Sequence, residues 1–91
     1  MAFTVNFPVD IGTFVITNYK KVDLNNPETL RGRVGNIACY QSVTQEDENG
    51  DSFIVMVSGY KDSWCGETFL DYLHIATDEE IELYKKVMGI E

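Results

Sequence analysis

Few residues of this chain could take part in covalent or metal chemistry: one histidine, His74, and two cysteines, Cys39 and Cys65. A histidine beside a cysteine can activate the thiol as a nucleophile, and Asp71 could then orient the ring. His74, however, lies between apolar residues in a strand-like pattern, which favours a strand residue that faces solvent or a rim. A zinc site needs three or four ligands. The sequence therefore predicts no enzyme, no metal site and no cofactor.

Two short motifs resemble functional sites but fail on spacing. Residues 47–51 begin like a calcium-binding loop, but Ser52 stands at the sixth position in place of glycine and Ser58 at the twelfth in place of glutamate. Residues 64–66 (Trp-Cys-Gly) are similar to the front of a thioredoxin-type redox site, but Thr68 stands where the second cysteine is required. A hairpin turn and an ordinary loop are predicted instead.

One group of aromatic and acidic residues is suited to binding rather than to catalysis. Four of its members fall in one loop and two tyrosines flank other loops: Tyr60, Asp62, Trp64, Glu67, Tyr19 and Tyr40. Exposed aromatic side chains near carboxylates make good recognition surfaces, because they bury much area at a low cost in entropy. The alternative is that the loop folds over the molecule and Trp64 fills the mouth of a barrel.

The charge balance indicates what kind of partner to expect. The chain has 15 acidic and 7 basic side chains and a formal net charge of −8. A polyanion repels such a surface, so nucleic acid is not predicted as a partner. The acidic residues gather in two clusters, within 46–51 and within 78–82. These clusters either form solvated faces or attract a protein partner with a basic surface.

Alternating apolar residues and turn signals predict a chain of short strands. The predicted strands cover residues 13–17, 33–44, 52–58 and 68–75. In the second strand, Ile37, Cys39 and Val43 are expected on one face and Ala38 and Tyr40 on the other. A long loop over 19–32 with a short helical turn at Asn26-Pro27-Glu28 joins the first two strands, and Asn49-Gly50 predicts a hairpin turn before the third.

The end of the chain has the clearest local signal. Thr77 and Glu80 form a capping box, acidic residues fill the first turn, and two lysines fill the last. Apolar residues follow at helical spacing, and Gly89 marks the end. The pattern predicts a helix over 78–88 that packs against an open end of the sheet.

Length and composition predict one domain over residues 1–91, with strands within 12–75. Phe3, Val5 and Phe7 alternate like a short strand, and no lysine or arginine precedes Lys20, so neither a signal peptide nor a membrane anchor is expected. A cytoplasmic protein is predicted, in the host cytoplasm if the protein is viral. The two cysteines are expected to be reduced and partly buried.

The order of motifs resembles the SH3-like small barrels. Gly12-Thr-Phe-Val-Ile16, a long loop, Gly32-Arg-Val-Gly35, a hairpin, Gly66-Glu-Thr-Phe69 and Ala76-Thr-Asp-Glu-Glu-Ile81 follow one another over about three-quarters of the chain. The resemblance implies a mainly β (α+β) fold: a small antiparallel barrel of four to five strands with one C-terminal helix. The ending is also similar to that of small acidic bacteriophage accessory proteins.

These observations lead to three functional hypotheses. The first is a non-enzymatic interaction module, a phage-encoded protein that binds and modulates or inhibits a bacterial host protein. The second is a small-ligand-binding or sequestering domain. The third is a structural virion or assembly component. A monomer or a small homo-oligomer suits each of them.

Overall fold

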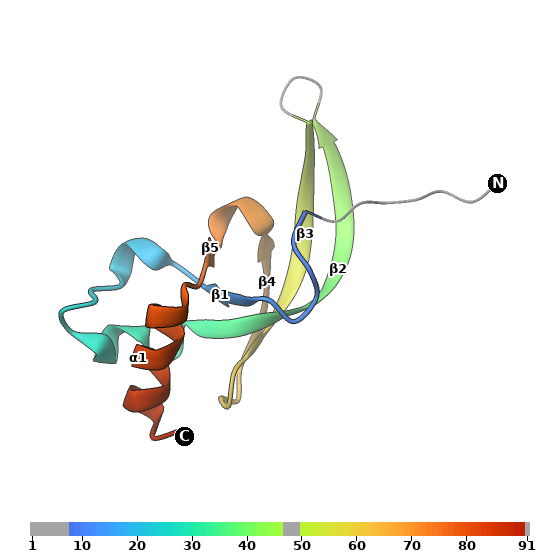
Figure 1. Cartoon of the computed structure of the whole chain (residues 1–91). Helices are drawn as coiled ribbons and strands as arrows, with labels where there is room; N and C mark the ends of the chain where they lie inside the picture. Colours follow the sequence, from blue (N-terminus) through green and yellow to red (C-terminus); the bar gives the residue numbers. More distant parts are fainter. Residues whose placement is uncertain (1–7, 47–49, 91) are drawn as a thin grey trace.

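The computed structural model describes residues 8–46 and 50–90. They form a small α+β protein with one antiparallel sheet and one C-terminal helix (Figure 1). In chain order the elements are β1 (Phe14–Ile16), η1 (Tyr19–Lys21), η2 (Pro27–Leu30), β2 (Val34–Glu46), β3 (Gly50–Gly59), β4 (Cys65–Phe69), η3 (Leu70–Tyr72), β5 (His74–Ile75) and α1 (Asp78–Met88), where η marks a 3-10 turn.

The five strands lie in the order β4-β3-β2-β1-β5. The sheet is not closed, because β4 and β5 form its two edges and do not pair with each other in the described part of the chain. The predicted α+β class with a C-terminal helix is confirmed, whereas the predicted barrel is not.

The predicted fourth strand over 68–75 is wrong. The chain leaves β4 at Phe69, makes the turn η3, and enters β5 at the opposite edge of the sheet. The amide of Leu73 donates to the carbonyl of Leu70 at 3.0 Å, and both side chains pack against the same core cluster. Apolar residues three apart therefore favour a 3-10 turn here, where alternation had indicated a strand.

Two apolar clusters form the core, one on each face of the sheet. Val15, Ile37, Val55 and Val57 form the first cluster. Ile16, Leu30, Val34 and Tyr84 form the second. Val15 and Ile16 are neighbours in β1 and are both fully buried, because successive side chains of a strand point to opposite faces. Strand β1 therefore links the two clusters.

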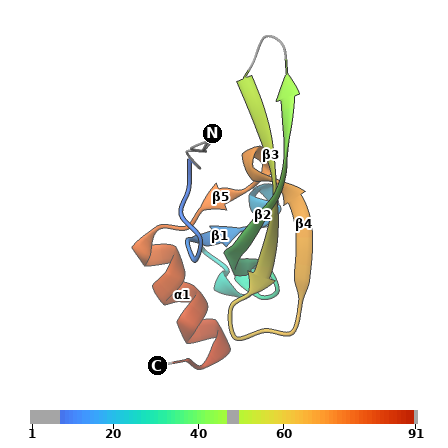
Figure 2. The same ribbon diagram turned by 90° about the vertical axis from the view of Figure 1, so that its right-hand side faces the viewer.

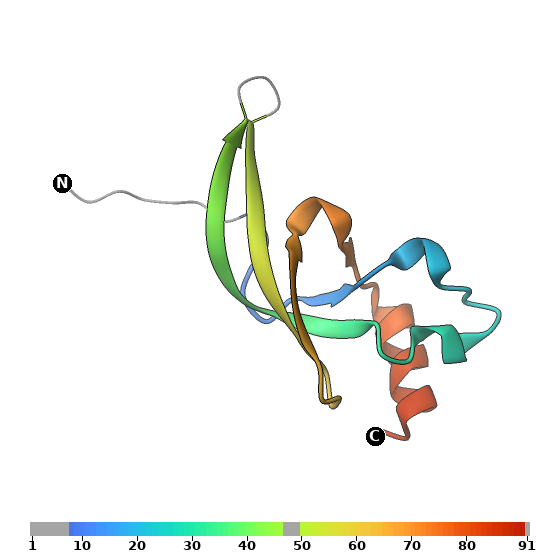
Figure 3. The same cartoon turned by 180° about the vertical axis from the view of Figure 1, so that it is seen from behind.

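The long strand β2 departs from simple alternation. Its register with β3 shifts between Ile37 and Cys39 and again between Tyr40 and Ser42. Such bulges bend a strand, and Figure 3 shows β2 curving from β1 into the arm that it makes with β3. As a result Tyr40 packs on the same cluster as Ile37, and the predicted face with Ile37 and Cys39 together is wrong.

Both cysteines are free and exposed, so the expectation of partly buried thiols is also wrong. The bulge turns Cys39 outward, and Cys65 begins the edge strand β4.

Helix α1 confirms the predicted capping box. The Thr77 hydroxyl accepts a hydrogen bond from the Glu80 amide, the Glu80 carboxylate accepts one from the Thr77 amide, and Gly89 ends the helix with a φ of 70°. The helix covers the second cluster with Tyr84 and lies beside η2, where Arg31 donates to the Val87 carbonyl at 3.0 Å. It therefore packs on one face of the sheet at the end away from the β2–β3 arm (Figure 1).

Strands β2 and β3 pair as a hairpin as far as Glu46 and Gly50. The predicted turn residue Asn49 and the alternating segment 3–7 lie outside the described residues. The predicted turn at Asn26-Pro27-Glu28 is confirmed as η2, with Pro27 in its first turn.

Candidate functional site

The two aromatic side chains of the predicted recognition loop are partly buried and pack against different clusters of the core. Trp64 packs against the first cluster, and Tyr60 packs against the second. A Cβ atom at Gly59 would lie 2.6 Å from the Nε1 atom of Trp64, so the indole ring occupies the space that this glycine leaves. Trp64 thus packs over one face of an open sheet, and there is no barrel mouth in the described part of the chain for it to fill.

The two acidic residues of that loop, Asp62 and Glu67, are exposed, whereas the two aromatic rings are partly buried. Asp62 accepts a hydrogen bond from the Ser63 amide at 2.8 Å, which fixes the turn. Glu67 lies on β4. The structure therefore does not bring the four loop residues into one exposed patch, and a binding role for this loop stays a prediction.

The two flanking tyrosines hold other segments in place. The Tyr40 hydroxyl donates to the Val9 carbonyl at 2.7 Å and accepts from the Val9 amide at 3.2 Å. Tyr19 stacks on the His74 ring, with centroids 3.6 Å apart and planes inclined by 11°. Tyr40 packs against the first cluster, as Trp64 does, whereas Tyr19 packs against the second, and each tyrosine joins segments that are distant in sequence.

A buried carboxylate, which the sequence interpretation missed, organises the region around Tyr19. Glu80 is 2% exposed. Its carboxylate accepts hydrogen bonds from the Tyr19 hydroxyl, from the Thr77 amide at 2.8 Å, and from His74 Nε2, which lies 2.9 Å from Oε1. This side chain therefore joins η1, β5 and α1, and it is not part of a solvated acidic face.

The pKa values of this cluster follow from its contacts. Burial alone raises the pKa of the Glu80 carboxyl group, but the hydrogen bonds from Tyr19, Thr77 and His74 outweigh burial and hold the pKa below its ordinary value of 4.5. The hydrogen bond to Glu80 raises the pKa of the Tyr19 hydroxyl, because deprotonation would place two negative oxygens together. Glu80 is thus a charged acceptor with three donors from its own chain, an arrangement that positions segments.

The signal for this cluster was present in the sequence but was incomplete. The capping box identified Glu80 as the acceptor at the start of the helix. His74 lies six residues earlier in β5, and its side chain is partly exposed. Only the tertiary fold brings Tyr19 to the same carboxylate, because 61 positions separate the two residues in the sequence.

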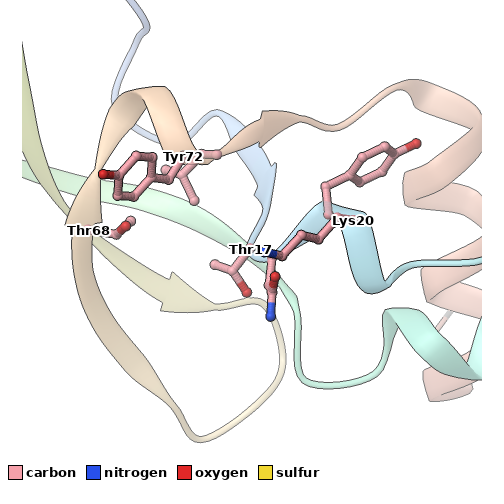
Figure 4. Close-up of a pocket in the computed structure, with 7 residues that line it drawn as sticks. Thr17, Lys20, Thr68 and Tyr72 are labelled. Carbon is pink, nitrogen blue, oxygen red and sulfur yellow. The ribbon is translucent and has the colours of Figure 1, made fainter.

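Beside this cluster lies an open cleft of about 600 Å³ between the β1–η1 loop and the β4–η3 segment. Its lining residues are Thr17, Asn18, Tyr19, Lys20, Thr68, Tyr72 and Leu73. Figure 4 shows Tyr72 and Thr68 on one side of the cleft and Lys20 on the other, with Thr17 between them. The Tyr19–His74–Glu80 contacts hold one wall in place.

Tyr72 at the other wall and the neighbouring Phe69 are the most exposed aromatic side chains of the described residues. Tyr72 is 71% exposed and Phe69 is 37% exposed, and their rings meet edge to face with centroids 5.5 Å apart. We call this pair the aromatic ridge. A second, smaller cleft is lined by both rings together with Ile54, Glu67 and Thr68. Tyr72 of the ridge and Thr68 line both clefts.

The charged residues near the ridge are mainly acidic. Glu67 lines the smaller cleft, and Asp71 lies next to Tyr72 in η3 and lines a third hollow with Leu73 and Ile75. Lys20 is the basic residue of the large cleft, on the wall opposite Tyr72. An apolar centre with carboxylates around it is suited to binding a surface that carries both apolar and basic groups.

Within the described ranges, no three His, Cys, Asp or Glu side chains are grouped so that they could hold a metal ion. The same residues contain no helix with the length and apolar character needed to cross a membrane.

Comparison of the chain with known proteins finds no matching family model, no matching curated protein and no matching solved structure.

Proposed function

We propose that this protein is a non-enzymatic interaction module and that the aromatic ridge is the centre of its contact surface. The supporting observation is the exposure of Tyr72 and Phe69 side by side at the edge of the sheet. Aromatic anchors carry much of the binding energy of protein interfaces, and exposed apolar groups rimmed by polar residues mark such interfaces.

The proposed partner is a protein with a basic surface. The net charge of −8 favours encounter with a positive surface, and Glu67 and Asp71 beside the ridge supply local complementarity. The same charge disfavours nucleic acid. The resemblances to SH3-like small barrels and to phage accessory proteins remain part of the proposal, with a bacterial host protein as the class of partner.

The test is affinity capture from a bacterial lysate, followed by binding measurements with the purified captured protein. Tyr72→Ala should weaken binding by roughly thirtyfold, because an interface anchor contributes about 2 kcal/mol. Ile11→Ala is the matched control, since Ile11 is 55% exposed and lines none of the three hollows described above. Equal affinities of both variants and the wild type would reject the ridge as the contact surface.

The size of the large cleft supports a second candidate, a small-ligand-binding domain. Its volume of about 600 Å³ falls in the range of ligand pockets, roughly 300–1,000 Å³, and its exposed lining is mostly apolar. The two candidates differ in what co-purifies with the chain. A stoichiometric protein supports the interaction module, whereas a metabolite that Thr17→Trp displaces from the cleft supports ligand binding.

A further inference from the structure

The two edges of the sheet differ in how far they are covered. Strand β5 has two residues and is followed almost at once by helix α1. Strand β4 has five residues, and among the described residues no strand pairs with its outer side. Figure 2 shows β4 as the outermost strand on its side of the sheet. An uncovered edge of this kind is a template for pairing with another extended chain.

The register identifies which backbone groups face outward from this edge. Hydrogen-bonded and non-hydrogen-bonded pairs alternate along an antiparallel ladder. The Gly59 amide donates to the Trp64 carbonyl at 2.8 Å, so Cys65, Glu67 and Phe69 occupy non-hydrogen-bonded positions opposite β3. The N–H and C=O groups of these three residues therefore point away from β3, toward the open side.

The edge also lacks the features that commonly prevent strand addition. The β3–β4 register runs through five pairs without a shift, in contrast to the bulged β2–β3 ladder. Strand β4 contains no proline and no lysine, and Glu67 is its one charged residue. Proteins protect exposed edges with bulges, prolines and lysines. The geometry of β4 is thus that of an acceptor strand.

We propose that an extended, basic segment of a protein partner adds to the outer edge of β4 as a sixth strand. This inference rests on the proposed interaction function and specifies the form of the partner. A lysine or arginine opposite Glu67 would pair with its carboxylate, and the partner residue two positions along would meet Phe69 of the aromatic ridge. The partner pattern is a basic residue and an apolar residue separated by one position.

A second copy of this chain fits the edge less well. Antiparallel pairing of two β4 strands about their centre would place Glu67 opposite Glu67, and like charges directly opposite each other are destabilising. The overall charge of −8 on each copy adds to this repulsion. The acidic edge therefore favours a basic partner segment over self-association.

Paired variants at Glu67 separate the contribution of its backbone N–H to partner binding from the contribution of its carboxylate charge. Glu67→Ala removes the carboxylate and keeps the outward N–H, whereas Glu67→Pro removes both. Proline is tolerated on an edge strand where its missing N–H faces solvent, so Glu67→Pro should keep the β3–β4 ladder. Cys65→Pro and Cys65→Ala form a second pair at the first residue of β4 in case Glu67→Pro fails to fold. Thermal melting checks the fold of each variant.

The probe is a linear peptide selected from a random peptide library on the immobilised full chain. We expect the selected peptides to contain a lysine or arginine and an apolar residue with one position between them. Glu67→Ala should weaken binding by about threefold, in a salt-dependent way. Glu67→Pro should weaken it by about a further tenfold, and bound peptide should slow hydrogen exchange of the Cys65, Glu67 and Phe69 amides.

Equal binding by each proline variant and its alanine control, with unchanged exchange of the three amides, would overturn strand addition. Selection of no peptide, or of peptides without basic residues, would overturn it as well. The proposed function fails on a different result, since it requires only that Tyr72→Ala weakens binding of the captured protein. A partner that depends on Tyr72 but not on the β4 amides would leave the interaction module standing without strand addition.

Discussion

At the scale of single residues, Trp64 shows how packing decides between two roles that one residue type can play. The side chain packs on the cluster of Val15, Ile37, Val55 and Val57 and fills the space above Gly59. Its Nε1 atom is buried and has no hydrogen-bond acceptor among the described residues. A buried donor without a partner costs free energy, so the apolar contacts of the ring must hold it in place.

Trp64 should therefore contribute mainly to stability. Trp64→Ala should lower the free energy of unfolding by about 3 kcal/mol, the lower end of the usual cost of removing a large aromatic side chain, because the ring is partly buried. Trp64→Phe should cost less, because a ring remains and the unpartnered N–H disappears. Denaturant unfolding measures both variants. If Trp64→Ala melts like the wild type but binds the partner more weakly, the loop is the recognition surface that the sequence first indicated.

Single residues also show that residue type and local spacing do not predict the contacts that a side chain makes in the fold. A single histidine beside apolar residues indicates a strand residue, and His74 does lie in β5. Its stacking on Tyr19 and its contact with Glu80 depend on how β5, η1 and α1 meet, which no local spacing reveals. The exposed pair Phe69 and Tyr72 was missed for the same reason, because their segment was predicted to continue as a strand.

At the scale of elements, helices and strands whose bounds depend on neighbouring residues in the sequence could be predicted. Features that depend on contacts between distant segments could not. The capping box and Gly89 fix both ends of α1 within a few residues, and the strands over 14–16, 34–46 and 50–59 follow from β-branched and alternating residues. The bulges of β2 and the crossover through η3 depend on contacts across the sheet. Local alternation contains no information about those contacts.

Glu80 connects three of these elements and makes their packing sensitive to pH. Its pKa in the folded protein lies below the ordinary value of 4.5, because three hydrogen bonds favour the charged form. The carboxylate therefore stabilises the fold fully above its unfolded pKa, and this contribution is lost as the pH falls through the folded pKa.

Glu80→Gln should remove that dependence. At neutral pH the variant should be less stable than the wild type by about 1–3 kcal/mol, because a charged acceptor of buried hydrogen bonds is lost. The difference should shrink as the pH falls below the ordinary carboxyl pKa of 4.5 and through the lower pKa of the folded protein. Urea unfolding at a series of pH values measures it, with the exposed Glu79→Gln as the control. A difference that stays constant down to acidic pH would show that charge on Glu80 does not matter to the fold.

At the scale of the whole molecule, an open sheet replaces the expected barrel, and this change determines where the surfaces of interest lie. Closure would have removed both edges. Instead, α1 and Trp64 cover opposite faces of the sheet, and no strand among residues 8–46 and 50–90 pairs with the outer side of β4. Composition and turn signals predict the α+β class and the C-terminal helix correctly. They do not determine whether the two edge strands, β4 and β5, pair with each other and close the sheet, because that depends on the path of the chain through η3.

The sharing of β1 between the two clusters predicts that the molecule unfolds as one unit. Val15 belongs to the first cluster and Ile16 to the second, so loss of either cluster removes the support of the same strand. Tyr84→Ala deletes the fully buried ring of α1 and should lower the free energy of unfolding by about 3–5 kcal/mol.

Trp64 lies on the other cluster, so its fluorescence reports independently on the far face. In the wild type and in Tyr84→Ala, the melting curve from Trp64 fluorescence should coincide with the curve from helical circular dichroism. Tyr84→Ala should shift both midpoints by the same amount. If the helix and the second cluster form a separate unfolding unit, Tyr84→Ala will lower the midpoint from circular dichroism and leave the midpoint from fluorescence unchanged. That result would contradict the prediction. Because adjacent residues of one three-residue strand are buried in both clusters, we expect the two midpoints to move together.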